Sequence, residues 1–237
     1  MELKIMSFNI QHGRDFNYPT EDRIDFDVMA NAIKKFSPDI VGLQEVRGKG
    51  ENPRYTEQAR ELAEKVGMEF AFAPAFNVPH GGPYGNALLS RFPILDVRNI
   101  PIPVPQTGYY CEPRCVLQAV LDIDGPVTVF VTHFGLTPPE AENASATAVE
   151  ALARTSTPKI LMGDFNLTPD NPVLDPIRIT MADTADVFEK PLLSFPSDAP
   201  SQKIDYVFVS DDFRIKSADI PEIVASDHRP HLATVEL

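Results

Sequence analysis

Short apolar runs of the kind that form buried strands recur along this chain, and several of them are followed or flanked by an acidic, amide or imidazole side chain. The pattern predicts strands over residues 3–10, 40–46, 68–73, 84–90, 94–99, 114–123, 127–133, 159–162, 204–209 and 231–235. Amphipathic or alanine-rich stretches between them predict helices over residues 23–36, 55–66 and 138–153. A domain of mixed strands and helices, an α/β fold, is therefore expected.

The chain is expected to form a single domain over residues 1–237. It is 43% hydrophobic and 23% charged, which is ordinary globular usage and leaves enough apolar surface for a substantial core. Repeats at fixed spacing, low-complexity tracts and charge blocks are missing from the sequence, so nothing marks a linker.

The charge balance restricts the choice of partner. Lys and Arg total 21 against 34 for Asp and Glu, so the formal net charge is −13 and the protein repels polyanions at long range. This argues against a nucleic-acid binder, although divalent cations bound in a cleft would raise the local potential.

Cysteine usage and the N-terminal sequence bear on the compartment. Cys111 and Cys115 exclude a disulfide framework and are expected to be small core residues, with a redox pair as the alternative. The segment MELKIMSFNIQHG is too polar for a signal peptide, and no apolar window approaches the length of a transmembrane segment. A cytoplasmic location is therefore expected.

The polar groups that follow or flank the apolar runs are the informative feature. Each alone has a simple explanation, because Asp and Asn are common in turns after strands. Together they supply hard oxygen ligands and imidazoles at one rim, which favours a Mg²⁺ or Mn²⁺ site over a zinc site. The set comprises Asn9, Glu45, His133, Asp164, Asn166, Asp205, Asp227 and His228.

These residues also carry a resemblance. The motifs FNIQHG, LQEV, YGNALLSRFPI, THF, GDFN, IDYVFVS and SDHRPH occur in the order seen in the endonuclease/exonuclease/phosphatase superfamily. The combination of GDFN, IDYV and SDHRP is specific, and the match spans nearly the whole chain. The resemblance implies a four-layer α/β sandwich, in which two packed mixed sheets are flanked by helices.

It also implies a role for each group. Glu45 resembles the principal metal ligand, Asn9 would coordinate or orient the same ion, and Asp227 would serve the metal. The catalytic residues are expected to be Asp164, which positions or activates water, Asn166, which holds the phosphate, and His228, oriented by Asp205. His133 resembles a second histidine that hydrogen-bonds the phosphate or protonates the leaving oxygen.

Asn86 and Arg114 are candidate substrate-binding residues. A structural role at the cleft edge is the alternative for Asn86, and a surface ion pair with Glu112 is the alternative for Arg114. Gln11 stands where apurinic endonucleases have an acidic residue, which argues against abasic-site cleavage. His12 is expected to be a turn histidine without a ligand, with a place in the lining of the cleft as the alternative, and His80 and His231 are expected to be structural.

Hydrolysis of a phosphate ester by in-line attack of water is the expected reaction. Dense basic runs are missing from the sequence, so a small or lipid-derived phosphate is favoured over a nucleic acid. A metal-dependent nuclease is the alternative within the enzymes, and a non-catalytic binding module of the same fold is the alternative outside them. The proline-rich loop 100–113 is a candidate specificity element.

Overall fold

Two sheets packed face to face form the centre of the fold in the computed structural model, which describes residues 1–18, 20–21, 23–189 and 191–237. Within these residues each sheet has six strands, in the orders β11-β12-β1-β2-β4-β3 and β5-β6-β7-β8-β10-β9. The strands are β1 (Glu2–Asn9), β2 (Ile40–Arg47), β3 (Glu69–Val78), β4 (Gly82–Ser90), β5 (Ile94–Pro101), β6 (Cys115–Asp122), β7 (Pro126–His133), β8 (Lys159–Asp164), β9 (Ala182–Asp183), β10 (Asp205–Val209), β11 (Arg214–Asp219) and β12 (His231–Glu236).

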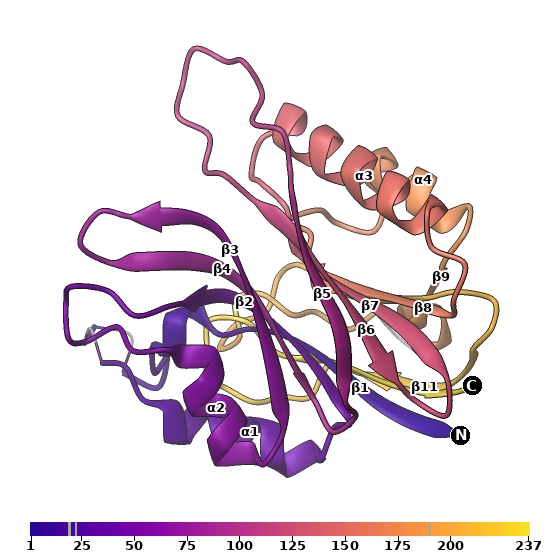
Figure 1. The fold of residues 1–237 in the computed structure, drawn as a ribbon, viewed down its shortest axis with the longest axis horizontal. Helices are drawn as coiled ribbons and strands as arrows, with labels where there is room; N and C mark the ends of the chain where they lie inside the picture. Colours follow the sequence, from indigo (N-terminus) through magenta and orange to yellow (C-terminus); the bar gives the residue numbers. More distant parts are fainter. Residues whose placement is uncertain (19, 22, 190) are drawn as a thin grey trace.

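Helices cover the outer face of each sheet and complete four layers. The helices α1 (Phe26–Phe36) and α2 (Gln58–Val66) pack on the first sheet, and α3 (Pro138–Ala153) and α4 (Asp175–Arg178) pack on the second (Figure 1). Short 3₁₀ turns are η1 (Gln11–Gly13), η2 (Pro172–Leu174) and η3 (Thr184–Val187). The expected α/β sandwich of two mixed sheets is confirmed.

Three buried apolar clusters match these layers. The central cluster lies between the sheets and includes Leu117, Val129 and Met162, while one further cluster lies under each pair of helices. Burial of apolar surface on both faces of each sheet explains why inner strands such as β2, β7 and β10 are buried along nearly their whole length. None of the helices in the described residues is long and apolar enough to cross a membrane.

Local chemistry moves two helix starts from their predicted positions. Helix α1 begins at Phe26 rather than at 23, because the carboxylate of Asp25 accepts hydrogen bonds from the backbone amides of Asp27 and Val28 and caps the first turn. Helix α2 begins at Gln58 rather than at 55. Helix α3 has its predicted bounds, and Glu140 accepts from the backbone N and the hydroxyl of Thr137 at its start.

Several strands differ from the prediction. Strand β11 was not predicted, because only two of its six residues are even partly buried and the hydrophobic pattern is weak. Strand β3 extends to Val78 because it pairs along the full length of β4. Cys111 lies in the loop before β6 rather than in a strand, yet both cysteines are buried and free, as expected of core residues.

The topology brings the ends of several strands to one rim. Strand β1 runs parallel to β2 in the first sheet, and β7 runs parallel to β8 in the second. Because the carboxyl ends of parallel strands meet at the same edge, Asn9 and Glu45 approach each other in one sheet, and His133 and Asp164 in the other. The long segment between β5 and β6 protrudes from the sandwich (Figure 1).

Candidate active site

The second sheet presents three of the expected residues in register. His133 pairs with Asp164 across β7 and β8, and Asp205 pairs with Asp164 across β8 and β10. The three residues are buried side by side at the strand ends. Gly163 makes this approach feasible, because a Cβ at that position would lie 2.1 Å from the carbonyl oxygen of Thr132.

Asp164 lies at the centre of the polar cluster. Its Oδ2 accepts a hydrogen bond of 3.0 Å from Nδ2 of Asn9, and lies 3.4 Å from Nε2 of His133 and 3.6 Å from Nε2 of His228. Its Oδ1 accepts a hydrogen bond of 2.9 Å from the backbone amide of Asn166. One carboxylate therefore connects both sheets and both expected histidines.

Glu45 reaches the rim through an irregularity in β2. The pairing of β2 with β4 shifts register between Leu43 and Val46, and Glu45 has a φ of 58°, in the left-handed region. Non-glycine residues rarely adopt this conformation, and it concentrates at functional sites. Nδ2 of Asn9 donates to Oε1 of Glu45 at 3.1 Å as well as to Asp164, so Asn9 ties the two acids together as a donor.

Asp227 is held by two hydrogen bonds. Its Oδ2 accepts from Nε2 of Gln11 at 2.8 Å, and its Oδ1 accepts from the hydroxyl of Ser226 at 3.0 Å. The backbone amide of Gln11 donates in turn to Oδ1 of Asn9. Gln11 is thus a part of the site that the sequence marked only as a departure from the apurinic endonucleases.

His228 contacts Asp205, the carboxylate that was predicted to orient it. Nδ1 of the imidazole lies 2.9 Å from Oδ2 of Asp205, which leaves Nε2 directed at Asp164. The ring of Phe195 packs on the imidazole with centroids 4.7 Å apart. Phe195 carried no signal in the sequence, because it lies in a loop 33 positions before His228 in the chain.

 

His231 supports the same residue from the other side. It is buried, and its Nδ1 donates to the backbone carbonyl of Asp205 at 3.0 Å. Burial lowers the pKa of His231 to about 3, so the ring is neutral. The expectation that His231 is structural fits this placement.

Burial and neighbouring charges shift the titration of the acidic groups. Burial raises the pKa of Glu45, and the charge of Asp227 raises it further. Burial is also the largest influence on Asp164 and on Asp227, and raises the pKa of both. Three buried carboxylates with raised pKa values form a favourable environment for a cation.

The two histidines are shifted in opposite directions. Burial alone would lower the pKa of His228, but Asp205 and Asp164 outweigh it and raise the value to about 10. Burial, the Arg114 guanidinium and His228 together lower the pKa of His133 well below its ordinary value. The rim therefore holds one imidazole that favours the charged form and one that favours the neutral form.

Arg114 lies in the cluster beside His133. Its Nη1 is 2.8 Å from Nδ1 of His133 and 3.0 Å from Oε1 of Glu112. The pair with Glu112 that we expected as an alternative is present, but the Arg114 side chain is only 11% exposed, so it is not an ordinary surface ion pair.

Two asparagines, Asn166 and Asn86, donate to backbone carbonyls. Asn166 follows β8 in a left-handed turn, with a φ of 52°. Its Nδ2 donates to the carbonyl of Phe134. Asn86 is buried and its Nδ2 donates to the carbonyl of Cys115 at 2.9 Å, which connects the two sheets and favours the structural alternative over substrate contact.

The remaining histidines divide between the rim and the surface. Nδ1 of His12 lies 4.0 Å from Oε2 of Glu45, so His12 borders the site, which favours the alternative that it lines the cleft. His80 is exposed and pairs with Glu51, away from the cluster.

The donor set fits a hard divalent cation. Glu45, Asp164 and Asp227 supply carboxylate oxygens, and Oε1 of Gln11 is buried without a hydrogen-bond partner among the described residues. Asp164, Asp205 and His228 also place one potential ligand atom each within 4.8 Å of one another, so this group could hold a metal ion. Because His228 is already bonded to Asp205, the oxygen-rich side around Glu45 suits Mg²⁺ or Mn²⁺ better.

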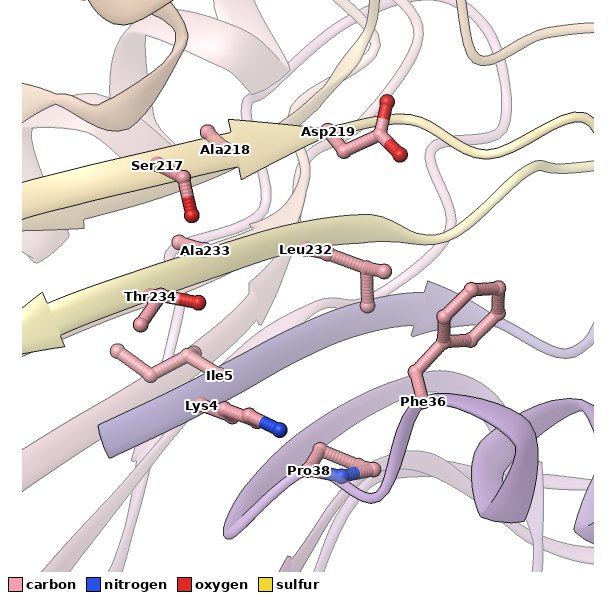
Figure 2. A pocket seen from close by; sticks show the side chains of 10 residues that line it. All are labelled: Lys4, Ile5, Phe36, Pro38, Ser217, Ala218, Asp219, Leu232, Ala233 and Thr234. Atoms are coloured by element: carbon pink, nitrogen blue, oxygen red, sulfur yellow. The ribbon is translucent and has the colours of Figure 1, made fainter. Parts of the chain in front are cut away.

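A separate pocket lies away from this cluster and is not a candidate catalytic centre. It has a volume of about 210 Å³ and lies over β1, β11 and β12 beside the end of α1 (Figure 2). Lys4 and Asp219 are the charged residues among those that line it, and the remaining lining is mostly apolar. It contains none of the clustered acids and histidines described above.

Comparison with known proteins agrees with this geometry. A sequence model of the Endonuclease/Exonuclease/phosphatase family matches residues 6–228. The chain belongs to this family. The matched range contains the whole cluster from Asn9 to His228, and proteins of the family are generally hydrolytic, acting as phosphatases, phosphodiesterases or nucleases.

Individual relatives are similar over their full length. The Escherichia coli K12 protein YbhP, described as uncharacterized, is 28% identical, and the alignment covers 99% of this chain and 96% of YbhP. The Bacteroides thetaiotaomicron mannosyl-6-phosphatase Bt3783 superposes with a TM-score of 0.81 at 18% identity, covering 99% of this chain and 100% of that one. The human Nocturnin catalytic domain superposes with a TM-score of 0.76 at 19% identity, covering 99% and 94%. At these identities the structural neighbours show the shared fold alone.

Proposed function

We propose that this protein is a divalent-metal-dependent phosphoesterase that hydrolyses a small or lipid-derived phosphate ester by in-line attack of water. The observation that carries the proposal is the bridge made by Asn9, whose Nδ2 donates to Glu45 on one sheet and to Asp164 on the other. It joins the acidic side of the rim to the side that holds both histidines. Carboxylates for a cation and imidazoles for a phosphate thus face one space.

The acidic side is suited to bind the metal. Glu45 and Asp227 would hold Mg²⁺ or Mn²⁺, with Asn9 and Gln11 orienting these acids. A cation bound there would polarise a phosphoryl oxygen and offset the negative charge that grows in the transition state. The raised pKa values of the three acids support this role, because a bound cation would relieve the cost of their burial.

The opposite side is suited to handle water and phosphate. Asp164, between the Nε2 atoms of the two histidines, is the group that positions or activates the attacking water. His228 contacts the scissile phosphate through Nε2 while Asp205 holds its Nδ1. Asn166 is proposed to help hold the phosphate, and His133, which Arg114 contacts through Nδ1, faces the same atoms.

A small substrate is favoured by charge. The net charge of −13 repels polyanions, whereas a single phosphate group needs few cationic contacts. Two reduced, buried cysteines fit a reducing compartment, and we propose the cytoplasm.

A nuclease is the second candidate. The guanidinium of Arg47 lies at the end of β2, two residues beyond Glu45, between the rings of Tyr55 and Tyr84 at 4.6 and 5.1 Å. Cationic and aromatic groups beside a phosphate site are the means by which proteins hold single strands. The same groups could hold the organic part of a small ester.

A substrate panel separates the two candidates. Purified protein with Mg²⁺ or Mn²⁺ would be offered bis-aryl phosphodiesters, aryl phosphomonoesters, sugar and inositol phosphates, and plasmid and single-stranded DNA. We expect turnover of a small ester and little cleavage of DNA. Faster cleavage of DNA than of every small ester would replace the small-substrate proposal with the nuclease.

A further inference from the structure

The contact between Arg114 and His133 fixes where the proton of that imidazole lies. Nη1 of Arg114 is 2.8 Å from Nδ1 of His133. A guanidinium carries only donors and keeps its proton at any physiological pH. The hydrogen between the two atoms therefore belongs to Arg114, and Nδ1 of His133 must accept it. The proton of the neutral imidazole is left on Nε2.

The surroundings hold both residues in this arrangement. Val116 pairs with Thr132, so Arg114 and His133 meet at the same end of the hairpin formed by β6 and β7. Oε1 of Glu112 lies 3.0 Å from the guanidinium, and the side chains of Arg114 and His133 are 11% and 5% exposed. A second proton on His133 would have to point at the guanidinium, which opposes it both sterically and by charge.

The free edge of the ring is aimed at the reacting groups. Nε2 of His133 lies 3.4 Å from Oδ2 of Asp164, the oxygen that also faces Nε2 of His228. Both histidines thus direct Nε2 at the carboxylate of Asp164. Asp205 contacts the far side of His228, and Arg114 contacts the far side of His133.

We propose that Arg114 is a positioning residue that locks His133 as the neutral Nε2–H tautomer. His133 then acts as a fixed hydrogen-bond donor to a phosphoryl or leaving-group oxygen, and not as the acid that gives up a proton. A neutral imidazole that lost its Nε2 proton would become an anion, which is inaccessible near neutral pH. The role of His133 as a donor to the substrate rests on the proposed phosphoesterase function, whereas the assignment of its tautomer does not.

Nitrogen NMR tests the tautomer without any substrate. In ¹⁵N-histidine-labelled protein, long-range ¹⁵N–¹H correlations distinguish Nε2–H, Nδ1–H and doubly protonated rings, and His133→Gln assigns one of the five histidines. We expect the Nε2–H pattern for His133 in the wild type. Arg114→Met should give a mixture or a protonated ring, and Arg114→Lys should restore part of the wild-type pattern. Arg154→Met, at the exposed residue that follows α3, is the matched control that should leave it unchanged.

Kinetics then tests the catalytic consequence. With a substrate that the wild type hydrolyses, Arg114→Met should lower kcat about 10-fold or more with a smaller change in KM, since a misplaced donor weakens transition-state binding. A rise in KM at constant kcat, with the tautomer unchanged, would instead make Arg114 a direct phosphate ligand and overturn the proposal. A wild-type protein with His133 in the Nδ1–H form would overturn it without any variant. Failure of all substrates would count against the proposed function alone, because the NMR result stands by itself.

Discussion

Replacing Glu45 with glutamine should raise the melting temperature of the metal-free protein and abolish its response to divalent cations. The carboxylate is largely buried near Asp227, and one hydrogen bond from Asn9 reaches it. Glutamine keeps the shape and an oxygen for Asn9 but carries no charge. One change therefore removes both a destabilising charge and a proposed metal ligand.

The two effects have comparable sizes and opposite signs. Substitutions that relieve a destabilised functional site commonly add about 0.5–2 kcal/mol to the free energy of unfolding. Each kcal/mol shifts the melting temperature of a domain of this size by about 2–4 °C, so the variant should melt about 1–8 °C higher without metal. A cation at about 100 times its Kd would stabilise the wild type by about 2.7 kcal/mol, or about 5–11 °C. The order of melting temperatures should therefore reverse when Mn²⁺ is added.

Calorimetry in EDTA and in Mn²⁺ at about pH 7.5 measures this reversal. Because the folded-state pKa of Glu45 lies above its ordinary value of 4.5, the destabilisation is absent below that pH and develops as the pH rises. The gain from Glu45→Gln should accordingly shrink at about pH 5. Glu150→Gln on the exposed face of α3 is the matched control and should change neither value. A variant that melts below the wild type in EDTA at about pH 7.5 would refute the reasoning.

Two further substitutions test the groups around the site. Asp205→Asn removes the carboxylate that raises the pKa of His228 to about 10, so the NMR-measured pKa should fall and kcat should drop about 10-fold to 100-fold. The raised pKa of His228 adds stability that is complete below pH 6.5, its ordinary pKa, and is lost as the pH rises through about 10. Between these pH values the metal-free Asp205→Asn variant should therefore lose less stability than the metal-free wild type. An equal loss would count against the pairing of His228 with Asp205. Gly163→Ala places a Cβ 2.1 Å from the carbonyl of Thr132 and should cost about 1–3 kcal/mol in a denaturant titration, whereas Gly108→Ala, with nothing within 4 Å of its Cβ, should cost far less. Equal costs for the two alanine variants would show that β8 can move away from β7.

The clustering of residues at the strand ends could be predicted from the sequence, because the carboxyl ends of parallel strands meet at one edge of a sheet. Asn9 and Glu45 end apolar runs that pair in parallel, and so do His133 and Asp164, so the hydrophobic pattern and the topology of an α/β fold bring them together. Asp205 follows from the same pattern, because its run pairs directly with the run that ends at Asp164.

The parts that could not be predicted depend on backbone conformation and long-range contact. The left-handed conformations of Glu45 and Asn166 leave no mark in the hydrophobic pattern, because neither residue is glycine. The packing of Phe195 on His228 and the hydrogen bond from Gln11 to Asp227 join segments far apart in the chain. The contact of Arg114 with His133 depends on the register of β6 against β7, two strands that were predicted without their register.

Hydrolysis by metal-depleted protein before and after addition of Mn²⁺ tests most directly whether this rim is a metal-dependent hydrolytic centre. The best substrate of the panel would be used with the wild type and with His228→Gln, after circular dichroism has shown that both are folded. We expect no turnover in EDTA, turnover by the wild type with Mn²⁺, and a loss of at least about 100-fold in kcat/KM for His228→Gln. Turnover that persists in EDTA, or a His228→Gln variant as active as the wild type, would contradict the assignment.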